Sequence, residues 1–548
     1  MHQLQTLDYI VFLIYFVGVS AYGYWIYRQK KQATTSSNDF FLAEGSLTWW
    51  AIGASLIASN ISAEQFIGMS ASGFAMGLAI ASYEWMAAAT LLVVAVFLLP
   101  IYLKNKIFTM PQFLAQRFSP TVATVMAVFW LLLYVFVNLT AIFYLGALAI
   151  GPLSGLSPTT CYIGLGLFAI FITLGGMKVI AFTDVIQVTV LIFGGLCTAY
   201  LAVDLVAQKF GGSGFFDGLS LIREKAADHF HMILQPGQII MPNGTGGTED
   251  AYNKLPGLAV IIGAMWIANL NYWGFNQYIT QRALGADLPT ARKGLLFAAF
   301  LKLLMPIIVV LPGIAAYVLW REGNPDFATG MLTADGNVKP DNAYPVLLGL
   351  LPVGLKGLSF AALTAAIVAS LAGKANSIST IFTLDIYKKL IKPDASEEQL
   401  VRVGRIGIIV AIVIGIIVAP QLGNFGQAFQ FIQDFTGLVS PGVVAIFLLG
   451  FFWRKTTANA ALIGALATFP IGLIIERMIT TLPFLHRMGI VFLILVALMV
   501  VVSLLDSRGT KNLKRIEFHT DMFRTDRSFT VGAVLLLGIL SALYLVFW

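Results

Sequence analysis

The sequence predicts an all-α polytopic membrane protein with about fourteen transmembrane helices. Of its 548 residues, 58% are hydrophobic and only 11% are charged, whereas a soluble domain carries about 25% charged residues. Apolar runs long enough to cross about 30 Å of hydrocarbon recur along the whole chain. Lys and Arg residues also alternate between the loops in the manner of a protein that crosses the membrane many times.

The apolar runs follow one another with mostly short connections. The first run is followed, and not preceded, by Arg28, Lys30 and Lys31, and it lacks a small-residue cleavage site. We therefore expect a retained helix and not a signal peptide. The runs lie at about 9–27, 48–73, 77–103, 121–150, 158–176, 180–207, 255–281, 293–320, 356–387, 401–419, 426–453, 457–480, 488–506 and 528–548.

The basic residues predict the orientation of these helices. If both termini lie outside, roughly two-thirds of the 34 Lys and Arg residues fall in cytoplasmic segments, as the positive-inside rule requires. Two others, Lys302 and Lys374, fall within expected spans. The net charge of +7 reflects this bias. No basic patch with interleaved aromatics is present, so we expect a lipid bilayer and no nucleic acid as partner. The apolar surfaces do not predict an oligomeric state.

The order of the runs predicts an inverted repeat. Without the first span and the last three, ten spans remain, five in each half. An odd number places the second half upside down relative to the first, as in transporters with inverted repeats. The expected divisions are a first helix and linker (1–44), repeat one (45–207), an outer loop (208–254), repeat two (255–453) and three C-terminal helices (454–548).

Polar residues interrupt the leading span of each half. Ser59, Asn60, Ser62, Glu64 and Gln65 crowd one otherwise apolar span. On a helix these side chains would point in every direction, so no single face could hide them from lipid. Such a segment at membrane depth is typical of a broken helix at a substrate or ion site. The matching span 255–281 carries Asn269, Asn271, Tyr272, Trp273, Gly274, Asn276 and Gln277.

Ionisable residues inside the expected spans need partners or a function, because a charge near the bilayer centre costs at least about 2.5–3.5 kcal/mol. A structural ion pair between Glu84 and Lys302 is one explanation. Binding of a ligand is the other. The residues concerned are Glu64, Glu84, Asp184, Lys302, Lys374 and Asp434.

Amides and aromatic rings accompany these charges. A polyhydroxylated ligand needs hydrogen-bond donors and acceptors around its rim and flat apolar surfaces against its faces, and this mixture supplies both. An acid would favour an Arg clamp, and no Arg lies inside an expected span. The amides are Asn60, Gln65, Asn269 and Gln433, and the aromatic residues are Tyr83, Tyr272, Trp273 and Phe429.

A sodium site is expected where the first helix breaks. Backbone carbonyls that an unwound helix leaves free are suitable sodium ligands. Carbonyls near Ala58 and Ile61 are candidates, and the hydroxyl of Ser370 could complete the site. The alternative for Ser370 is a hydrogen bond to its own helix, which is common for serine in membrane helices.

Four stretches of sequence resemble the solute:sodium symporter family. They are ASNISAEQFIGM (58–69), GLAIASYEWM (77–86), WGFNQY (273–278) and the text around Leu449 to Trp453. The resemblance runs over nearly the whole chain. It implies a LeuT-type core of five plus five helices, alternating access, and sodium-driven uptake of a neutral monosaccharide, galactose or glucose, across a bacterial cytoplasmic (inner) membrane.

The resemblance also implies residue roles. Tyr272 would stack on the sugar as the inner gate, beside Trp273, with Asn60 bonding the Tyr272 hydroxyl. Asp184 would lie on a possible sodium path. Hydrogen bonds to the sugar are expected from Gln65, Glu84, Asn269, Lys302 and Gln433, outer-gate contacts from Met69, Tyr83 and Phe429, and sodium ligands from Ala58, Ile61, Ala366 and Ser370.

The chain departs from the family pattern at several hydroxyl positions. The position of a sugar-binding serine is Ala87 here, so the identity of the sugar is left open. The position of a hydroxyl residue beside the sodium site is Ala369. Positions that help to bind a second sodium read Ala372 and Gly373. One sodium per sugar is therefore expected. Lys374 is a candidate fixed positive charge beside these positions, with snorkelling towards solvent as the alternative.

Other functions fit the sequence less well. Another small polar solute, such as inositol, is the alternative substrate. An enzyme is not expected, because the five His residues lie in loops or at span ends without ligand spacing. A sensor would carry a signalling domain, and the loops are short. A passive channel would show uptake that is independent of sodium. No role is predicted for Glu64.

Overall fold

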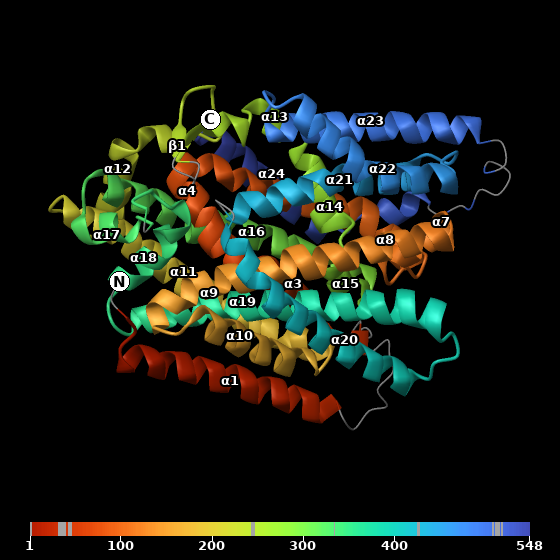
Figure 1. Ribbon diagram of the computed structural model, residues 1–548, viewed down its shortest axis with the longest axis horizontal. Helices are drawn as coiled ribbons and strands as arrows, with labels where there is room; N and C mark the ends of the chain where they lie inside the picture. The colour runs from red at the N-terminus through yellow and green to blue at the C-terminus, as the bar shows by residue number, and fades with distance from the viewer. Residues whose placement is uncertain are drawn as a thin grey trace.

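The computed structural model describes residues 3–30, 40–41, 47–242, 247–333, 335–424, 428–506, 509, 514, 516 and 519–548. The described chain is almost wholly helical, because a backbone in lipid must satisfy its hydrogen bonds within its own segment. Strands β1 (Ile240–Pro242) and β2 (Thr248–Asp250) form one short antiparallel ribbon. Figure 1 shows the long helices running side by side along the long axis of the molecule.

The first half of the chain runs from α1 to α11. Its elements are α1 (Thr6–Lys30), α3 (Trp49–Asn60), η1 (Glu64–Met69), α4 (Ser70–Met76), η2 (Gly77–Ala81), α5 (Ser82–Val93), η3 (Val94–Leu98), α6 (Leu99–Lys104), α7 (Met110–Arg117), α8 (Pro120–Leu132), η4 (Leu133–Leu139), α9 (Thr140–Ser154), α10 (Pro158–Thr173) and α11 (Met177–Lys209).

The second half begins with a long connection that contains β1 and β2. Its helices are α12 (Phe215–Lys225), η5 (Ala227–Phe230), η6 (Ala251–Asn253), α13 (Leu258–Ile262), α14 (Met265–Gly274), α15 (Gln277–Leu284), α16 (Leu288–Arg321), α17 (Pro325–Gly330), η7 (Pro340–Asn342), α18 (Ala343–Leu350), α19 (Leu355–Thr380), η8 (Ile381–Ile391), α20 (Glu397–Val418), η9 (Ala419–Asn424), α21 (Ala428–Phe452), α22 (Ala458–Met478), α23 (Phe484–Leu505), η11 (Thr520–Phe523) and α24 (Arg527–Val546).

The helices confirm a polytopic membrane protein. Within the described residues, eleven helices are long and apolar enough to cross a membrane, or up to twelve if one bent pair counts as a single span. All fourteen predicted runs fall on helices, although Pro158–Thr173 is short for a span. The count of fourteen therefore stays a prediction, while the helical class is established.

Both ends of the described chain lie towards the same end of the molecule, near α12 and α17 (Figure 1). The Asp8 carboxylate accepts hydrogen bonds from the backbone N–H of Gly354 and Gly357, at 2.7 and 2.8 Å, where α19 begins. The N–H of Met232 donates to the carbonyl of Phe547 at 2.7 Å.

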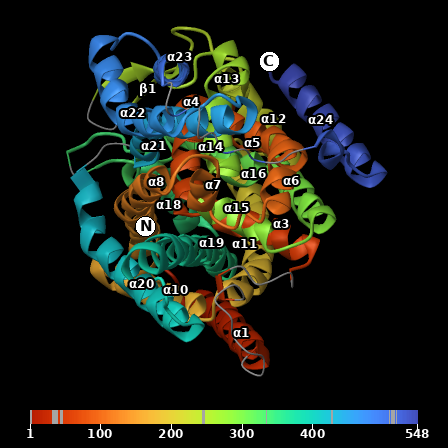
Figure 2. The ribbon, with the colours of Figure 1, turned by 90° about the vertical axis from the view of Figure 1, so that its right-hand side faces the viewer.

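Burial separates a central group of helices from a peripheral one. Helix α19 belongs to the segment Leu355–Ile391, and 89% of the residues in the most apolar part of this segment are buried inside the protein. The corresponding shares are 22% for α1 and 17% for α24. Figure 2 accordingly shows α19 within the bundle and α1 and α24 at its edge. Apolar side chains on the peripheral helices are therefore available to lipid.

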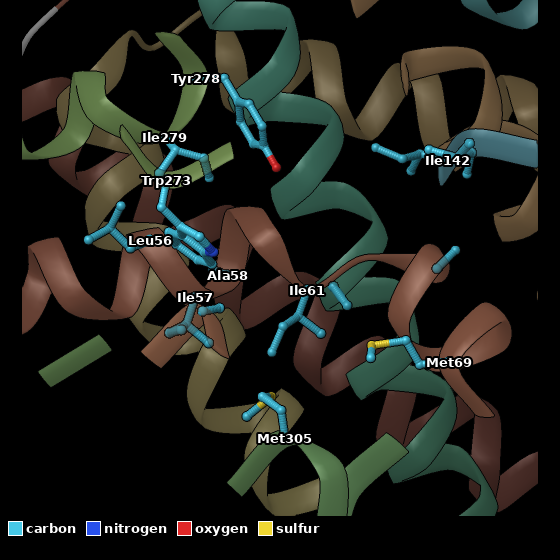
Figure 3. Packing of buried hydrophobic residues seen from close by; sticks show 14 of the residues in the cluster. Leu56, Ile57, Ala58, Ile61, Met69, Ile142, Trp273, Tyr278, Ile279 and Met305 are labelled. Atoms are coloured by element: carbon cyan, nitrogen blue, oxygen red, sulfur yellow. The ribbon is translucent and has the colours of Figure 1, made fainter. Parts of the chain in front are cut away.

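The first predicted interruption is present in the structure. Helix α3 ends at Asn60, and Ile61 leaves helical geometry with φ −83° and ψ 113°. The chain resumes at Glu64 in a π-helical turn, η1, which leads into α4. The break therefore occupies the polar segment that the sequence singled out. Figure 3 shows the residues on both sides of it, with Ala58 and Ile61 next to each other.

The second predicted interruption is also present, towards the end of its polar run. The polar residues 269–273 remain helical in α14, and the chain leaves the helix only at Phe275 and Asn276. A further bend of 74° separates Ala251–Ile262 from Met265–Gly274. A Cβ atom at Gly263 would lie 2.5 Å from the carbonyl oxygen of Ala259, so the bend depends on a residue without a side chain.

Glycines bring α16 close to the broken helix. A Cβ atom at Gly313 would lie 2.0 Å from the carbonyl oxygen of Ser70, and one at Gly73 would lie 2.6 Å from that of Val310. Small residues allow such close approach between membrane helices. This packing holds α16, which carries Lys302, against α4.

Candidate functional site

A cavity of about 100 Å³ lies beside the two helix breaks. Residues from α3, η1, α5, α14, α16, α19 and α21 line it, so both halves of the chain contribute. The lining mixes charged, amide and aromatic side chains. It consists of Asn60, Glu64, Gln65, Met69, Tyr83, Glu84, Ala87, Leu133, Asn138, Ala268, Asn269, Asn271, Tyr272, Trp273, Asn276, Lys302, Lys374, Ile432, Gln433 and Thr436.

Lys302 is the centre of a hydrogen-bonded chain in this cavity. Its ammonium donates to Glu84 Oε2 and to Asn60 Oδ1, and it lies 5.1 Å from the centroid of the Trp273 ring. The side chains of Lys302 and Glu84 are 1% and 4% exposed. A buried ion pair of this kind is stable only with further hydrogen bonds, and Asn60 provides one.

Asn60 continues the chain to the aromatic residues. Its Nδ2 donates to the Tyr272 hydroxyl at 2.8 Å, and that hydroxyl also contacts the hydroxyl of Tyr278. The Tyr272 and Trp273 rings meet edge to face with centroids 5.1 Å apart. The first helix break and α14 are therefore linked through a single amide side chain.

Three other polar lining residues have local partners as well. Gln65 Oε1 accepts from the N–H of Ser62 at 2.9 Å. Asn269 Nδ2 donates to the Met265 carbonyl at 3.1 Å, and Asn271 Nδ2 donates to Ser440 Oγ at 2.9 Å. These bonds orient the amides towards the cavity, where the remaining atoms of each amide are chemically suited to the hydroxyls of a polyol.

Ser370 on α19 faces the carbonyls of the broken helix. Its hydroxyl lies 2.8 Å from the Ser59 carbonyl, 3.3 Å from that of Ile61 and 3.5 Å from that of Ala58. The hydroxyl thus does not bond back to its own helix, which was the alternative. Ala366 is fully buried one turn earlier on α19. Hard oxygen atoms gathered at a helix break form a setting suited to sodium.

Asp184 lies close to this cluster and has a partner that the sequence did not predict. Ser55 Oγ donates to Asp184 Oδ2 at 2.5 Å, and Arg282 Nη2 is 3.9 Å from the same oxygen. Arg282 Nε also donates to Ser55 Oγ at 2.9 Å. The Arg282 side chain is 1% exposed.

Nearly all the predicted site residues lie in these two neighbouring clusters. The cavity holds Gln65, Glu84, Asn269, Lys302, Gln433, Tyr272, Trp273, Asn60, Met69 and Tyr83. Ala58, Ile61 and Ser370 form the second cluster, with Ala366 near them on α19. The side chain of Phe429 lies outside the described residues. Their functional roles stay predictions, since position alone does not assign them.

The family model for the sodium:solute symporter family matches residues 40–468 of this chain. The chain belongs to this family. A sodium/glucose cotransporter from Vibrio parahaemolyticus is 47% identical over 100% of this chain and 99% of its own length. A mouse sodium/myo-inositol cotransporter 2 is 33% identical over 86% of this chain and 70% of its own length. The predicted membership of a transporter family, and not of an enzyme family, is confirmed.

One solved structure shares the fold of this symporter. The substrate-bound, outward-open Na⁺-coupled sialic acid symporter matches with a TM-score of 0.75 and 22% identity, over 91% of this chain and 98% of the other. At this identity the likeness shows a shared fold. The chain is thus a sodium:solute symporter with the helical architecture of that symporter.

Two features of the symporter correct the sequence analysis. The statement that no Arg lies inside an expected span was wrong, because Arg402 and Arg405 fall within 401–419 and Arg477 falls within 457–480. In addition, Arg282 directly follows the expected span 255–281 and is buried. Its guanidinium lies beside Asp184 and Ser55 and is not among the groups that line the cavity. Lys374 does not snorkel. It is 3% exposed and pairs with Glu64, Nζ to Oε1, at 3.4 Å.

Proposed function

We propose that this symporter carries a neutral hexose, glucose or galactose, across a bacterial cytoplasmic membrane together with one sodium ion, by alternating access. The proposal rests on one observation: residues of the same helix break lie both at the proposed sodium site and at the cavity. Its carbonyls at Ala58 and Ile61 lie next to Ser370, and its Asn60 side chain bonds Lys302 and Tyr272. An ion at the carbonyls would therefore fix the residue that orders the sugar cavity.

We assign to this arrangement the residue roles that the family resemblance implies. Tyr272, anchored by Asn60, forms the inner gate beside Trp273, and Met69, Tyr83 and Phe429 form the outer gate. Hydrogen bonds to the sugar come from Gln65, Glu84, Asn269, Lys302 and Gln433. Sodium is held by Ala58, Ile61, Ala366 and Ser370, and Asp184 lies on its path.

The architecture completes the proposal. We assign fourteen spans with both termini outside, which agrees with the two chain ends lying at one end of the molecule (Figure 1). The two inverted repeats of five spans occupy 45–207 and 255–453. They follow the first helix and linker (1–44), are separated by the outer loop (208–254), and precede the three C-terminal helices (454–548).

A neutral polyol fits the cavity better than an acid does. The cavity lining includes five amide side chains besides Asn60 and Gln65, while the buried Arg282 guanidinium lies 3.9 Å from Asp184 and donates to Ser55 Oγ. Myo-inositol is the second candidate substrate, because its ring of hydroxyls has the same hydrogen-bonding chemistry and a relative named for it is 33% identical. The amides are Asn138, Asn269, Asn271, Asn276 and Gln433.

Uptake into proteoliposomes tests this proposal. Labelled glucose, galactose and myo-inositol are offered with an inward sodium gradient, and with potassium in place of sodium as the control. We expect accumulation of glucose or galactose that requires sodium and collapses with a sodium ionophore. Uptake at the same rate in potassium would indicate a passive channel and contradict the proposal.

One sodium per sugar is supported by the surroundings of Gly373. A Cβ atom there would lie 2.4 Å from Arg282 Nη2 and 3.1 Å from Ser59 Oγ. The guanidinium thus fills the space where a hydroxyl side chain for a second ion would stand. One charge moving through 100 mV supplies about 2.3 kcal/mol, or roughly 50-fold accumulation of sugar.

We therefore expect a charge-to-sugar ratio of about one, as carried by a single sodium ion. The ratio is measured by comparing sugar flux with charge movement at a series of clamped potentials in proteoliposomes. A ratio close to two would show that a second ion binds despite Arg282, and the assignment of one sodium would then be wrong.

A further inference from the structure

The ion pair between Lys374 and Glu64 has no part in the sugar or sodium contacts described above. Both side chains are largely enclosed, with exposures of 3% and 12%, and both line the cavity. The Lys374 ammonium also lies 5.3 Å from the centroid of the Tyr278 ring. A buried pair of opposite charges beside an ion site affects that site, because Coulomb interactions are strong where water is excluded.

The pair joins the same two elements as the proposed sodium site. Ser370 and Lys374 are four residues apart on α19 and therefore lie on one face of the helix. Ser370 meets the carbonyls before the break, and Lys374 meets Glu64, the first residue after it. The N–H of Glu64 donates to Ser62 Oγ at 3.0 Å within the break. The break is thus held to α19 on both sides.

The charges at this point balance only while both partners remain. Without Lys374, the Glu64 carboxylate would be an unpaired anion in a membrane cavity, where it is costly unless a cation joins it. Without the carboxylate, the ammonium would stand one helical turn from the sodium ligand Ser370 and repel the ion. The two losses therefore have opposite electrostatic signs.

Building on the proposed function, we propose that Lys374 is a tethered counter-cation for Glu64 that keeps the site selective for a single sodium ion. Its ammonium takes the place beside the helix break that a second mobile cation would otherwise occupy. Lys374 and Glu64 are positioning residues, since they act through the break and α19. The pair sets both the number of ions bound and the affinity for sodium.

Three variants test the pair by charge. For Glu64→Gln we expect the sodium concentration for half-maximal sugar uptake to rise at least about tenfold, because the ammonium is left unpaired. For Lys374→Met we expect the charge-to-sugar ratio to rise above the wild-type value, because the carboxylate recruits a second cation. The neutral double variant E64Q/K374M should return to the wild-type ratio, with half-saturation within about threefold of wild type.

The control variants distinguish an effect of charge from a general structural effect of the substitution. Lys374→Arg keeps the charge and should keep the wild-type ratio. Arg402→Met breaks an exposed ion pair with Glu398 and should change nothing. If both single variants shift sodium dependence in the same direction with an unchanged ratio, or if the double variant behaves like either single one, the proposal is wrong. If the Lys374→Met variant does not insert into the membrane, the double variant and Glu64→Gln test the role of the ion pair by the same criteria.

Failure of this proposal and failure of the proposed function give different results. Absence of sodium-dependent sugar uptake by the wild-type protein contradicts the proposed function itself. Wild-type uptake with one sodium per sugar, combined with a Lys374→Met variant that keeps the wild-type ratio, contradicts only the role of the ion pair.

Discussion

Lys302→Met is expected to abolish sodium-dependent sugar uptake, with a loss of at least about 100-fold. The Lys302 ammonium donates to Glu84 and Asn60 in an enclosed site. Removing one partner of a buried ion pair costs about 3–5 kcal/mol, because the other charge is left uncompensated. The measurement is initial uptake of labelled glucose and galactose in proteoliposomes, normalised to the amount of inserted protein.

The double variant E84Q/K302M distinguishes a ligand-binding pair from a structural one. It removes both charges and leaves no buried ion unpaired, so insertion and thermal stability should recover. If Glu84 and Lys302 bind the sugar, uptake remains abolished in this stable protein. Recovery of uptake to near the wild-type level would show that the two residues only neutralise each other, which is the alternative that the sequence left open.

The sequence identified the residues that line the cavity because the membrane makes polar side chains conspicuous. Asn60, Gln65, Glu84 and Lys302 each stand in a long apolar run, and a polar group in lipid requires a reason. The first helix break was predicted for the same reason, since five polar residues within two helical turns cannot share a face. The helical class followed from hydropathy alone.

The partners of these residues could not be predicted in the same way. Glu64 and Lys374 are 310 residues apart in sequence, and no local pattern relates them. Arg282 follows the apolar run and so falls outside the expected span, yet its side chain is buried beside Asp184 and Ser55. Polar segments also do not determine where a backbone bends, as the bend at Gly263 shows.

The break after α3 contributes to both proposed sites, the one for sodium and the one for sugar. Carbonyls belong to the backbone, so a shift at Ala58 or Ile61 moves Asn60 with them. Asn60 in turn bonds Lys302 and the Tyr272 hydroxyl. Coupling between two sites requires an element whose equilibrium both ligands bias. If sodium and sugar bind as proposed, the segment 58–61 would be that element.

Ser370→Ala tests the ion side of this coupling. The Ser370 hydroxyl lies within 3.5 Å of the carbonyls of Ala58, Ser59 and Ile61. Loss of an oxygen that contacts a charged group costs about 1.5–3 kcal/mol. We therefore expect the sodium concentration for half-maximal uptake to rise about 10- to 100-fold, while sugar binding at saturating sodium changes little. Uptake measured over a series of sodium concentrations gives this value.

Thr364→Ala is the matched control, because it removes a buried hydroxyl from the same helix. The Thr364 hydroxyl donates to the carbonyl of Phe360 at 2.9 Å, within α19, so its loss should leave sodium dependence unchanged. Equal shifts in the two variants would indicate a general effect of altering α19. An unchanged half-saturating concentration in Ser370→Ala would remove the hydroxyl from the sodium site and leave only the backbone carbonyls of the break as ligands.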